Sequence, residues 1–324
     1  MTQKITLAHG NGGKLMRELI RDVFATEFDN PAIREMSDAA TFPVHSQHLK
    51  ITTDGYTVDP IFFPGGDIGK LAMCGTINDL VVSGAIPEYF TVNFFIEEGF
   101  ELDKLRRIAI SMKNVAQKNN IAIIAGDTKV LPKGGVNGIY LATTGVGRIA
   151  ATHLSFNNIK PGDKLYASGP LGDHGATVLL ARNEFGLTGK LESCCASVLT
   201  TGRQLMGQQD VKFMRDPTRG GVATVCHELI EKTGLGITLY QDQLPIRESV
   251  KSFCDILGLE PLYLASEGRI IFIADACWSA DFINGELHEI GIVEATHSNL
   301  LLRTSIGGQR IIPELESNPL PRIC

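Results

Sequence analysis

The sequence has few charged residues and no long apolar run, and both shortages exclude whole classes of protein. Of its 324 residues, 20% are charged and the formal net charge is −6, so no basic patch is evident that could neutralise nucleic-acid phosphates. Its apolar runs, such as 121–125, are too short to cross a bilayer, and the first residues lack a basic stretch followed by an apolar one. We therefore expect a cytoplasmic protein that binds neither nucleic acid nor a membrane.

The seven cysteines show neither a Cys-x-x-Cys pattern nor a histidine at zinc-ligand spacing, which argues against structural zinc and a disulfide framework. Cys74, Cys226 and Cys254 occur in apolar stretches, where a small buried side chain is the ordinary role. Cys324 differs, because it follows a proline-rich segment without apolar periodicity. Proline fixes φ and has no backbone donor, so we expect residues 312–324 to form an extended, mobile tail.

The apolar spacing divides the chain into two halves that each mix strands with helices. The first half is predicted to have strands at 49–53, 88–98, 121–127 and 138–149 and helices at 67–84 and 101–120. The second half is predicted to have strands at 163–169, 236–240, 269–275 and 288–295 and helices at 174–186, within 195–208, at 221–233 and at 247–258. A polar stretch with a Pro-Gly turn separates the halves. This pattern predicts an α+β fold with mixed α/β domains at 1–155 and 156–311.

Glycine-rich segments could bring backbone N–H groups close to phosphate oxygens. HGNGGK at 9–14 precedes a predicted helix, and RDPTRGG at 215–221 adds Asp216 and Arg219 to a helix start. GPLGDHG at 169–175 has a similar composition. The segment at 64–71 lacks the glycine spacing of a P-loop and the Ser or Thr that binds magnesium there. Each loop taken alone could equally be an ordinary turn.

Four aspartates stand at or just beyond the ends of apolar elements: Asp54, Asp59, Asp79 and Asp127. Elements that pack side by side would bring such ends together. Magnesium takes oxygen ligands and bridges carboxylates to nucleotide phosphates, so the group suits Mg-ATP. Any one of the four could instead be a helix cap or a turn residue.

Other candidate catalytic side chains are less distinctive. Lys129 follows Asp127, and Glu267 lies in a turn before a predicted strand. A lysine acts as a base near neutral pH only if burial or a nearby cation lowers its pKa from ~10.4, so Lys129 could instead be a phosphate partner and Glu267 a turn carboxylate. His174 and His227 could be catalytic, but a lone histidine at a helix start or on a helix face is more typical of a structural role.

Taken together and in order, these segments resemble the HypE family of hydrogenase maturation proteins, which are carbamoyl dehydratases. The resemblance rests on HGNGGK, the run from Thr52 to Ala85, AGDTKV, GPLGDHGA, RDPTRGG, ASEG and the final Pro-Arg-Ile-Cys. It spans the first loop to the last residue. There are two departures, Asn11 and Gly55, where the family often has serine, and neither removes a charge or a ligand.

The resemblance implies the two-domain fold shared with aminoimidazole ribonucleotide synthetase and selenophosphate synthetase, which usually dimerises through N-domain strands. It also implies a reaction. A HypF-type carbamoyltransferase loads a carbamoyl group onto the thiol of Cys324, and ATP then converts the thiocarboxamide to a thiocyanate. The cyanide passes to a HypC-HypD-type scaffold complex and becomes an iron ligand of nickel-iron hydrogenase.

The resemblance also implies roles for individual residues. Cys324 carries the substrate group, and Lys129 and Glu267 handle protons. ATP and Mg²⁺ are the expected cofactors, with Asp54, Asp79 and Asp127 as metal ligands. The expected nucleotide-binding residues are His9, Gly10, Gly12, Gly13, Lys14, Asp54, Asp59, Lys70, Asn78, Asp79, Asp127, Thr128, Asp216 and Arg219.

Three other interpretations stay open on the residues alone. An enzyme of the same fold could phosphorylate a small oxygen or selenium substrate and make no use of the tail. A carrier protein could hold on Cys324 a group made elsewhere, with unused nucleotide loops. The chain could also be an ATP-binding protein in which Cys324 has no role.

Overall fold

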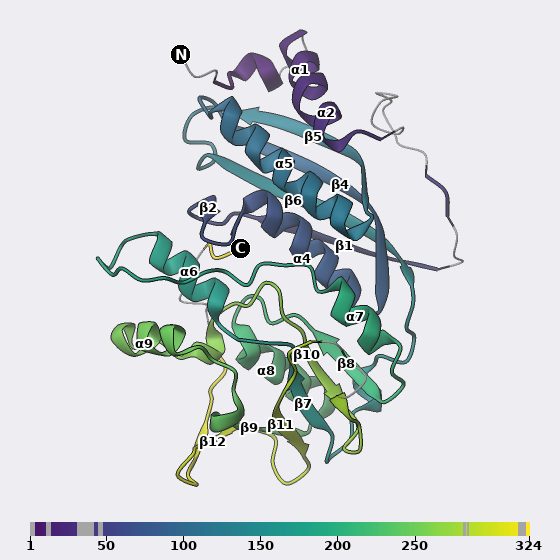
Figure 1. Cartoon of the computed structure of the whole chain (residues 1–324), viewed down its shortest axis with the longest axis vertical. Helices are drawn as coiled ribbons and strands as arrows, with labels where there is room; N and C mark the ends of the chain where they lie inside the picture. The colour runs from purple at the N-terminus through teal and green to yellow at the C-terminus, as the bar shows by residue number, and fades with distance from the viewer. Residues whose placement is uncertain are drawn as a thin grey trace.

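The computed structural model of the chain describes residues 4–10, 14–30, 42–44, 48–280, 283, 285–316 and 322–324. The molecule is elongated, with a four-stranded sheet in its N-terminal half and a seven-stranded sheet in its C-terminal half (Figure 1). No helix in this described part of the chain is both long and apolar enough to cross a membrane.

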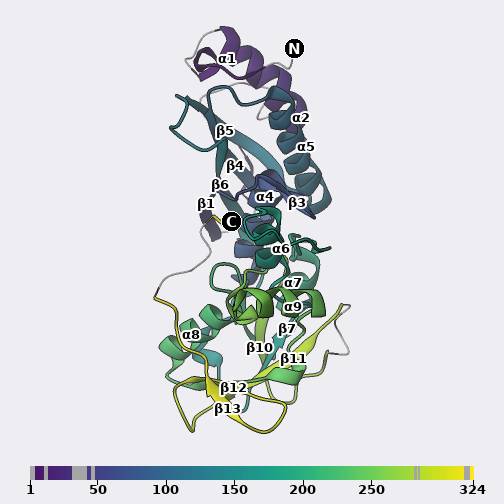
Figure 2. The ribbon, with the colours of Figure 1, turned by 90° about the vertical axis from the view of Figure 1, so that its left-hand side faces the viewer.

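The N-terminal sheet has the strand order β1-β6-β4-β5. Its strands are β1 (Leu49–Tyr56), β4 (Ala85–Glu97), β5 (Ala122–Leu131) and β6 (Ile139–Ile149), and a short hairpin joins β2 (Phe62–Phe63) to β3 (Gly66–Asp67). The long helices α4 (Ile68–Val82) and α5 (Leu102–Asn119) pack on one face of this sheet (Figure 2). β4 and β6 therefore alternate buried with half-buried residues, and the half-buried face is left open by the described helices.

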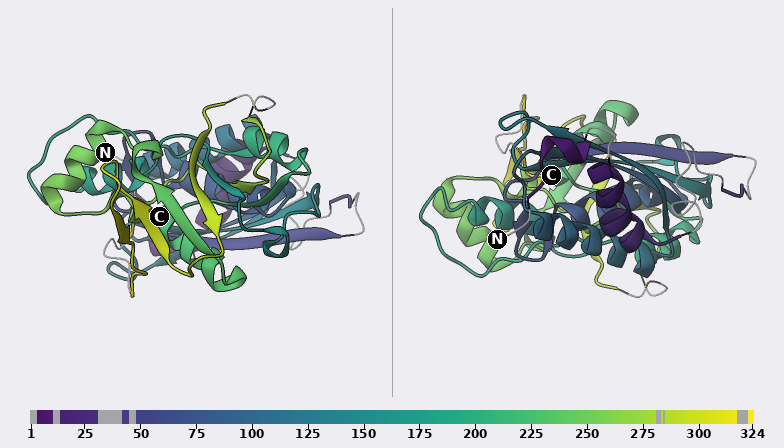
Figure 3. Two further views of the ribbon diagram at one scale, coloured as in Figure 1. Left: turned by 90° about the horizontal axis from the view of Figure 1, so that it is seen from below. Right: turned by 90° about the horizontal axis from the view of Figure 1, so that it is seen from above.

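Local sequence explains the two long helices. The side chain of Asp67 accepts hydrogen bonds from the backbone N–H groups of Gly69 and Lys70, which caps the start of α4. In α5 the buried residues recur every three or four positions, and the helix ends at Asn120 in the left-handed conformation. η2 (Ile20–Ala25) and α2 (Thr26–Phe28) lie against α5, while η1 (Leu7–Gly10) lies against β5 and α1 (Lys14–Leu19) joins η1 to η2; this N-terminal segment is drawn in purple in Figure 3.

The C-terminal sheet has the strand order β13-β12-β9-β11-β7-β10-β8. Its strands are β7 (Lys164–Ala167), β8 (Val211–Arg215), β9 (Gly236–Tyr240), β10 (Ile271–Ala274), β11 (His288–Glu294), β12 (Leu300–Arg303) and β13 (Gln309–Ile311). Its helices are α6 (Asp173–Ala181), α7 (Leu199–Met206), α8 (Gly221–Thr233) and α9 (Glu248–Leu257), with short turns η3 (Phe156–Asn158), η4 (Gln241–Gln243) and η5 (Pro261–Tyr263). One apolar core runs through both halves, and a second fills the C-terminal half.

The mixed α/β architecture predicted from the sequence is confirmed, and each predicted helix and strand overlaps one in the structure. The short strands β2, β3, β8, β12 and β13 were not predicted. Residues 150–163 connect the two sheets, and we propose that the domains divide there, at 155. Ile312 is buried in the core of the C-terminal half and donates its N–H to Leu300, so we propose that the tail begins after it.

The end of the predicted tail is docked rather than free. Residues 322–324 lie in the junction between the two halves, where the C-terminus is marked in Figures 1 and 2. The Ile323 side chain belongs to the apolar core, and backbone groups of Thr57 and Asp59 donate to the carbonyls of Cys324 and Arg322.

We predict that Gly202→Ala loosens the packing of α7 against α4. A Cβ at Gly202 would lie 2.1 Å from Cγ1 of Val81, which is buried in α4. The overlap should lower the free energy of unfolding by about 1–3 kcal/mol, measured by urea denaturation. Gly207→Ala at the end of the same helix is the control, because its Cβ would meet nothing closer than 3.4 Å. Equal stabilities of the two variants would contradict this account.

Candidate active site

Four carboxylates from both halves gather at the junction. Asp54 lies on β1 and Asp79 on α4, while Asp216 follows β8 and Glu267 precedes β10. Thr52 donates to Asp79 at 2.9 Å. The raised pKa values of Asp79, Asp216 and Glu267 show that neighbouring carboxylates act on them electrostatically, so the packing of the two halves builds one acidic site.

Burial and mutual repulsion change the protonation of these groups. Burial, followed by the nearby charge of Asp79, raises the pKa of Asp216 to about 7. Burial also raises the pKa of Asp79, and Asp54 adds to the effect. Glu267 is 1% exposed, its Oε1 has no partner among the described residues, and burial with Asp216 raises its pKa well above the ordinary value. Glu267 is therefore suited to hold or exchange a proton.

Cys324 lies beside this group of carboxylates. Burial, followed by the charge of Glu267, raises the pKa of its thiol to about 12, while Arg219 acts in the opposite direction. Arg219 also lies 3.7 Å from Asp54. The docked thiol is therefore protonated near neutral pH, and the charges of Glu267, Asp54 and Asp216 all act on it.

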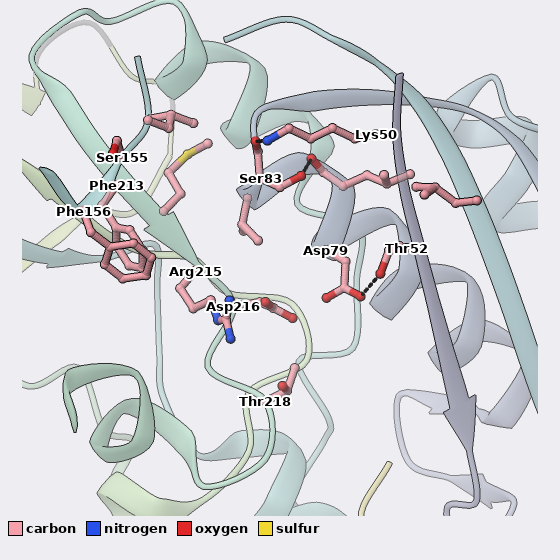
Figure 4. A pocket seen from close by; sticks show the side chains of 15 residues that line it. Lys50, Thr52, Asp79, Ser83, Ser155, Phe156, Phe213, Arg215, Asp216 and Thr218 are labelled. Atoms are coloured by element: carbon pink, nitrogen blue, oxygen red, sulfur yellow. Dashed lines mark hydrogen bonds between the residues drawn. The ribbon is translucent and has the colours of Figure 1, made fainter. Parts of the chain in front are cut away.

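A cavity of about 700 Å³ opens next to these carboxylates, a size that suits a small ligand. Figure 4 shows Asp79, Thr52 and Asp216 on one side of it and the rings of Phe156 and Phe213 on the other. The two ring centroids are 4.8 Å apart. Arg215, Thr218 and Lys50 also line the cavity. It thus offers an apolar wall for a flat ring and polar groups for phosphates.

A second group of predicted site residues lies at the other edge of the N-terminal sheet. Asp127 and Lys129 lie on β5 and form an ion pair at 2.8 Å, and both are about half exposed. Asp127 is three strand spacings, or about 14 Å, from Gly55 beside Asp54, through the paired residues Ala142 and Asn93. Within one chain, Asp127 and Lys129 are therefore not brought to Asp54 and Cys324.

The short 3-10 helix η1 lies at the same edge of the sheet as this second group. A Cβ at Gly10 would lie 2.8 Å from Val130, so His9 and Gly10 are next to β5. Thr128 is buried on the same strand. Gly12 and Gly13 lie outside the described residues, as does the side chain of Lys14. The nucleotide-binding roles of these residues stay predictions.

The other predicted residues make structural contacts in the junction. The Lys70 ammonium donates to the carbonyl of Gly65 at 2.7 Å, and Asp59 pairs with Arg322 at 3.3 Å. The buried Asn78 amide donates to the carbonyls of Ala196 and Glu267 and accepts from the N–H of Val198. Their roles in binding a nucleotide also stay predictions.

The donor set partly fits the expected magnesium ion. Asp54, Asp79 and Asp216 are hard oxygen donors whose mutual repulsion a cation would relieve. Across the described part of the chain, however, no three His, Cys, Asp or Glu side chains already stand close enough to hold a metal ion. Asp127 is separated from the others by the width of the sheet.

Sequence reasoning missed several residues of the junction. Phe156 and Phe213 line the cavity, and Thr57 and Arg182 bind the docked tail. His174, which the sequence left without an assigned role, donates to the carbonyl of Ile323. Arg182 has no local sequence signal, whereas His174 lies in the glycine-rich segment at 169–175.

Comparison with known proteins places this geometry in a family. Residues 36–149 match the AIR synthase related protein, N-terminal domain, and residues 160–298 match the corresponding C-terminal domain. Carbamoyl dehydratase HypE of Rhodobacter capsulatus is 39% identical over 335 aligned residues, which cover 99% of this chain and 98% of the relative. The chain belongs to the carbamoyl dehydratase HypE family. The family, the fold and the enzyme class predicted from the sequence are thereby confirmed.

Solved structures agree with this assignment to the HypE family. Hydrogenase maturation protein HypE in complex with ATP superposes with a TM-score of 0.93 at 38% identity, covering 98% of this chain and 99% of that one. The structure of a HypE–HypF complex superposes with a TM-score of 0.78 at 39% identity, covering 94% and 100%. These similarities cover both halves of the chain and the junction between them.

We predict that stability depends on pH through Glu267. Its raised pKa means that the folded chain keeps a proton that the unfolded chain releases near pH ~4.3, so this stabilisation is full below that pH and is lost as pH rises toward the folded pKa. Glu267→Gln stays neutral. Between about pH 5 and pH 8, urea denaturation should show a steeper loss of stability for the wild type than for Glu267→Gln. The control is Glu248→Gln, whose carboxylate is 86% exposed, and a Glu267→Gln profile parallel to the wild type would refute the assignment.

Proposed function

We propose that this chain uses ATP to dehydrate a thiocarboxamide on its own Cys324 to a thiocyanate, which supplies cyanide for nickel-iron hydrogenase during its maturation. The observation that carries the proposal is the position of Cys324 in the junction. Its thiol is close enough to Glu267 for that carboxyl to raise its pKa, and a cavity of nucleotide size lies beside the same acidic group.

The reaction balances with ATP as the acceptor of the lost water. The amide oxygen of the thiocarboxamide takes the γ-phosphoryl group, which turns a poor leaving group into phosphate. The nitrogen then loses its protons, the carbon–oxygen bond breaks and a C≡N bond remains. We assign acceptance of a nitrogen proton to Glu267 in its ionised form, because its Oε1 has no partner among the described residues, its charge acts on Cys324 and its burial excludes water.

We propose that the cavity holds the nucleotide. Phe156 and Phe213 would pack on the base, and Arg215 with Arg219 would pair with phosphate oxygens. Asp54 and Asp79, joined by Asp216, would hold magnesium, which supplies neutralisation of phosphate charge.

We propose that two partner proteins act on the tail of this chain. A HypF-type carbamoyltransferase would load Cys324, as suggested by the HypE–HypF complex structure, and a HypC-HypD-type scaffold would accept the cyanide. The docked thiol is protonated and partly buried, so we propose that the tail leaves the junction for loading and for delivery.

We also propose a homodimer built on the open face of the N-terminal sheet. Ile51 on the edge strand β1 is 71% exposed, and Asp127 and Lys129 lie on the same open face. A second copy on this face would cover Ile51 and come close to Lys129. The catalytic role expected for Lys129 and the ligand role expected for Asp127 depend on this assembly.

The dehydration proposal predicts a mass change at the tail. The full chain is incubated with carbamoyl phosphate and the carbamoyltransferase, with and without Mg-ATP, and the C-terminal peptide is analysed by mass spectrometry. We expect a carbamoyl adduct on Cys324 that loses one water only with Mg-ATP. Glu267→Ala should bind ATP normally but lose water slowly.

Controls separate the competing functions. Cys277→Ser changes an exposed cysteine and should leave both steps intact, whereas Cys324→Ser should give no adduct. Absence of any adduct on the wild type would favour a synthetase that acts on a small molecule. An adduct that never loses water would favour a carrier.

The dimer proposal predicts that Ile51→Asp dissociates the chain into monomers in sedimentation equilibrium. A charge on a covered apolar surface is costly, because it must be desolvated without a partner. Ile256→Asp is a matched control, since Ile256 is 66% exposed on α9 in the other half. A wild type that sediments as a monomer, or dissociation by both variants alike, would refute the proposed face.

A further inference from the structure

The last three residues dock through their backbone. The N–H groups of Thr57 and Asp59 donate to the carbonyls of Cys324 and Arg322 at 3.1 and 3.2 Å. The two donors are two residues apart, and so are the two acceptors, but the chain directions are opposite. An added antiparallel strand pairs with a sheet edge in the same way. Residues 57–59 therefore offer a short edge to an extended peptide.

Two buried or half-buried side chains complete this docking site. Arg182 donates to the carbonyl of Arg322 at 2.8 Å and, through Nε, to the carbonyl of Asp59 at 2.9 Å. His174 is fully buried, and its Nε2 lies 2.7 Å from the carbonyl of Ile323. A carbonyl only accepts, so Nε2 carries the hydrogen.

A fixed chain of hydrogen bonds holds His174 in that tautomer. Its Nδ1 lies 2.8 Å from Ser193 Oγ, which accepts the backbone N–H of Cys195 at 3.0 Å. Ser193 therefore donates to the bare Nδ1. Burial lowers the pKa of His174 to about 4, so the ring stays neutral and keeps this arrangement. If the tail left, the Nε2–H would lose its partner inside the protein, which favours the docked state.

Side-chain contacts select which peptide fits. Ile323 is 3% exposed in the apolar core. Arg322 donates to the carbonyl of Thr57 at 2.8 Å, pairs with Asp59 and lies over the ring of Tyr140. These contacts hold Arg322 at a φ of 54°, which non-glycine residues rarely adopt. None of the described hydrogen bonds to the tail uses the thiol of Cys324.

We propose that Thr57, Asp59, His174 and Arg182 form a peptide-binding site for the Arg-Ile-Cys end of the tail, and that this site recognises the tail whether or not the thiol carries a group. The site also accepts the same peptide from a separate molecule. This inference rests on the proposed function, in which the site seats the loaded tail beside Glu267. His174 and Arg182 are positioning residues, because they act through the tail backbone.

The test measures how fast each cysteine of the full chain reacts with N-ethylmaleimide, read by peptide mass spectrometry without ATP or partners. Exposed Cys277 is the fast reference, and fully buried Cys226 reports whether the fold is intact. His174→Leu and Arg182→Met should each speed modification of Cys324 about tenfold, the scale expected for one buried hydrogen bond. Cys226 should stay protected in both.

His153→Leu is a matched control, because His153 Nε2 lies 3.1 Å from another backbone carbonyl, that of Gln208. It should leave the rate at Cys324 unchanged. Unchanged rates at Cys324 in both His174→Leu and Arg182→Met, with Cys226 protected, would overturn the proposal. Because no catalytic step is involved, that result would leave the dehydration proposal standing.

A second measurement uses the wild-type chain and so avoids any effect of a variant on folding. A peptide of residues 317–324 with serine in place of the cysteine should displace the tail and speed modification of Cys324 severalfold. The same peptide with aspartate in place of the isoleucine should not, because its charge would enter the apolar core. Equal effects of the two peptides, or no effect of either, would overturn binding from a separate molecule.

Discussion

The junction of the two halves depends on one buried amide, that of Asn78 on α4. It donates to the carbonyls of Ala196 and Glu267 and accepts from the N–H of Val198, so three backbone groups of the C-terminal half are fixed to one helix of the N-terminal half. A buried amide left without partners would be costly, so these hydrogen bonds fix the position of one half relative to the other. Because Glu267 is among the groups that it binds, the position of the carboxyl relative to Cys324 follows from this contact.

The same burial that aligns the junction also changes the protonation of its carboxyl groups. Asp79, Asp216 and Glu267 all have raised pKa values, because water is excluded and each carboxylate repels the others. Such a group is costly for an empty protein and useful for one that binds a cation and moves protons. Asn78 and the surrounding apolar core offset this cost, which explains why an acidic site can persist between two domains.

Much of the fold could be predicted, because long elements repeat their apolar pattern several times. The buried face of α5 and the alternation along β4 are examples. β12 and β13 have only four and three residues, too few to show a period. The predicted grouping of Asp127 with Asp54 failed within one chain for a different reason. Both follow apolar elements, but strand order places them at opposite edges, and periodicity carries no information about strand order.

The tail-binding residues could not be predicted either, because their partners are distant in sequence. His174 and Ile323 are 149 residues apart, and nothing near His174 indicates a carbonyl at its Nε2. Recognition through carbonyls nevertheless has a chemical consequence. A site that read the thiol would bind the free and loaded tails with different affinities and would trap one of them. A site that reads the backbone treats both alike, so the group on Cys324 can change while the tail returns to the same place.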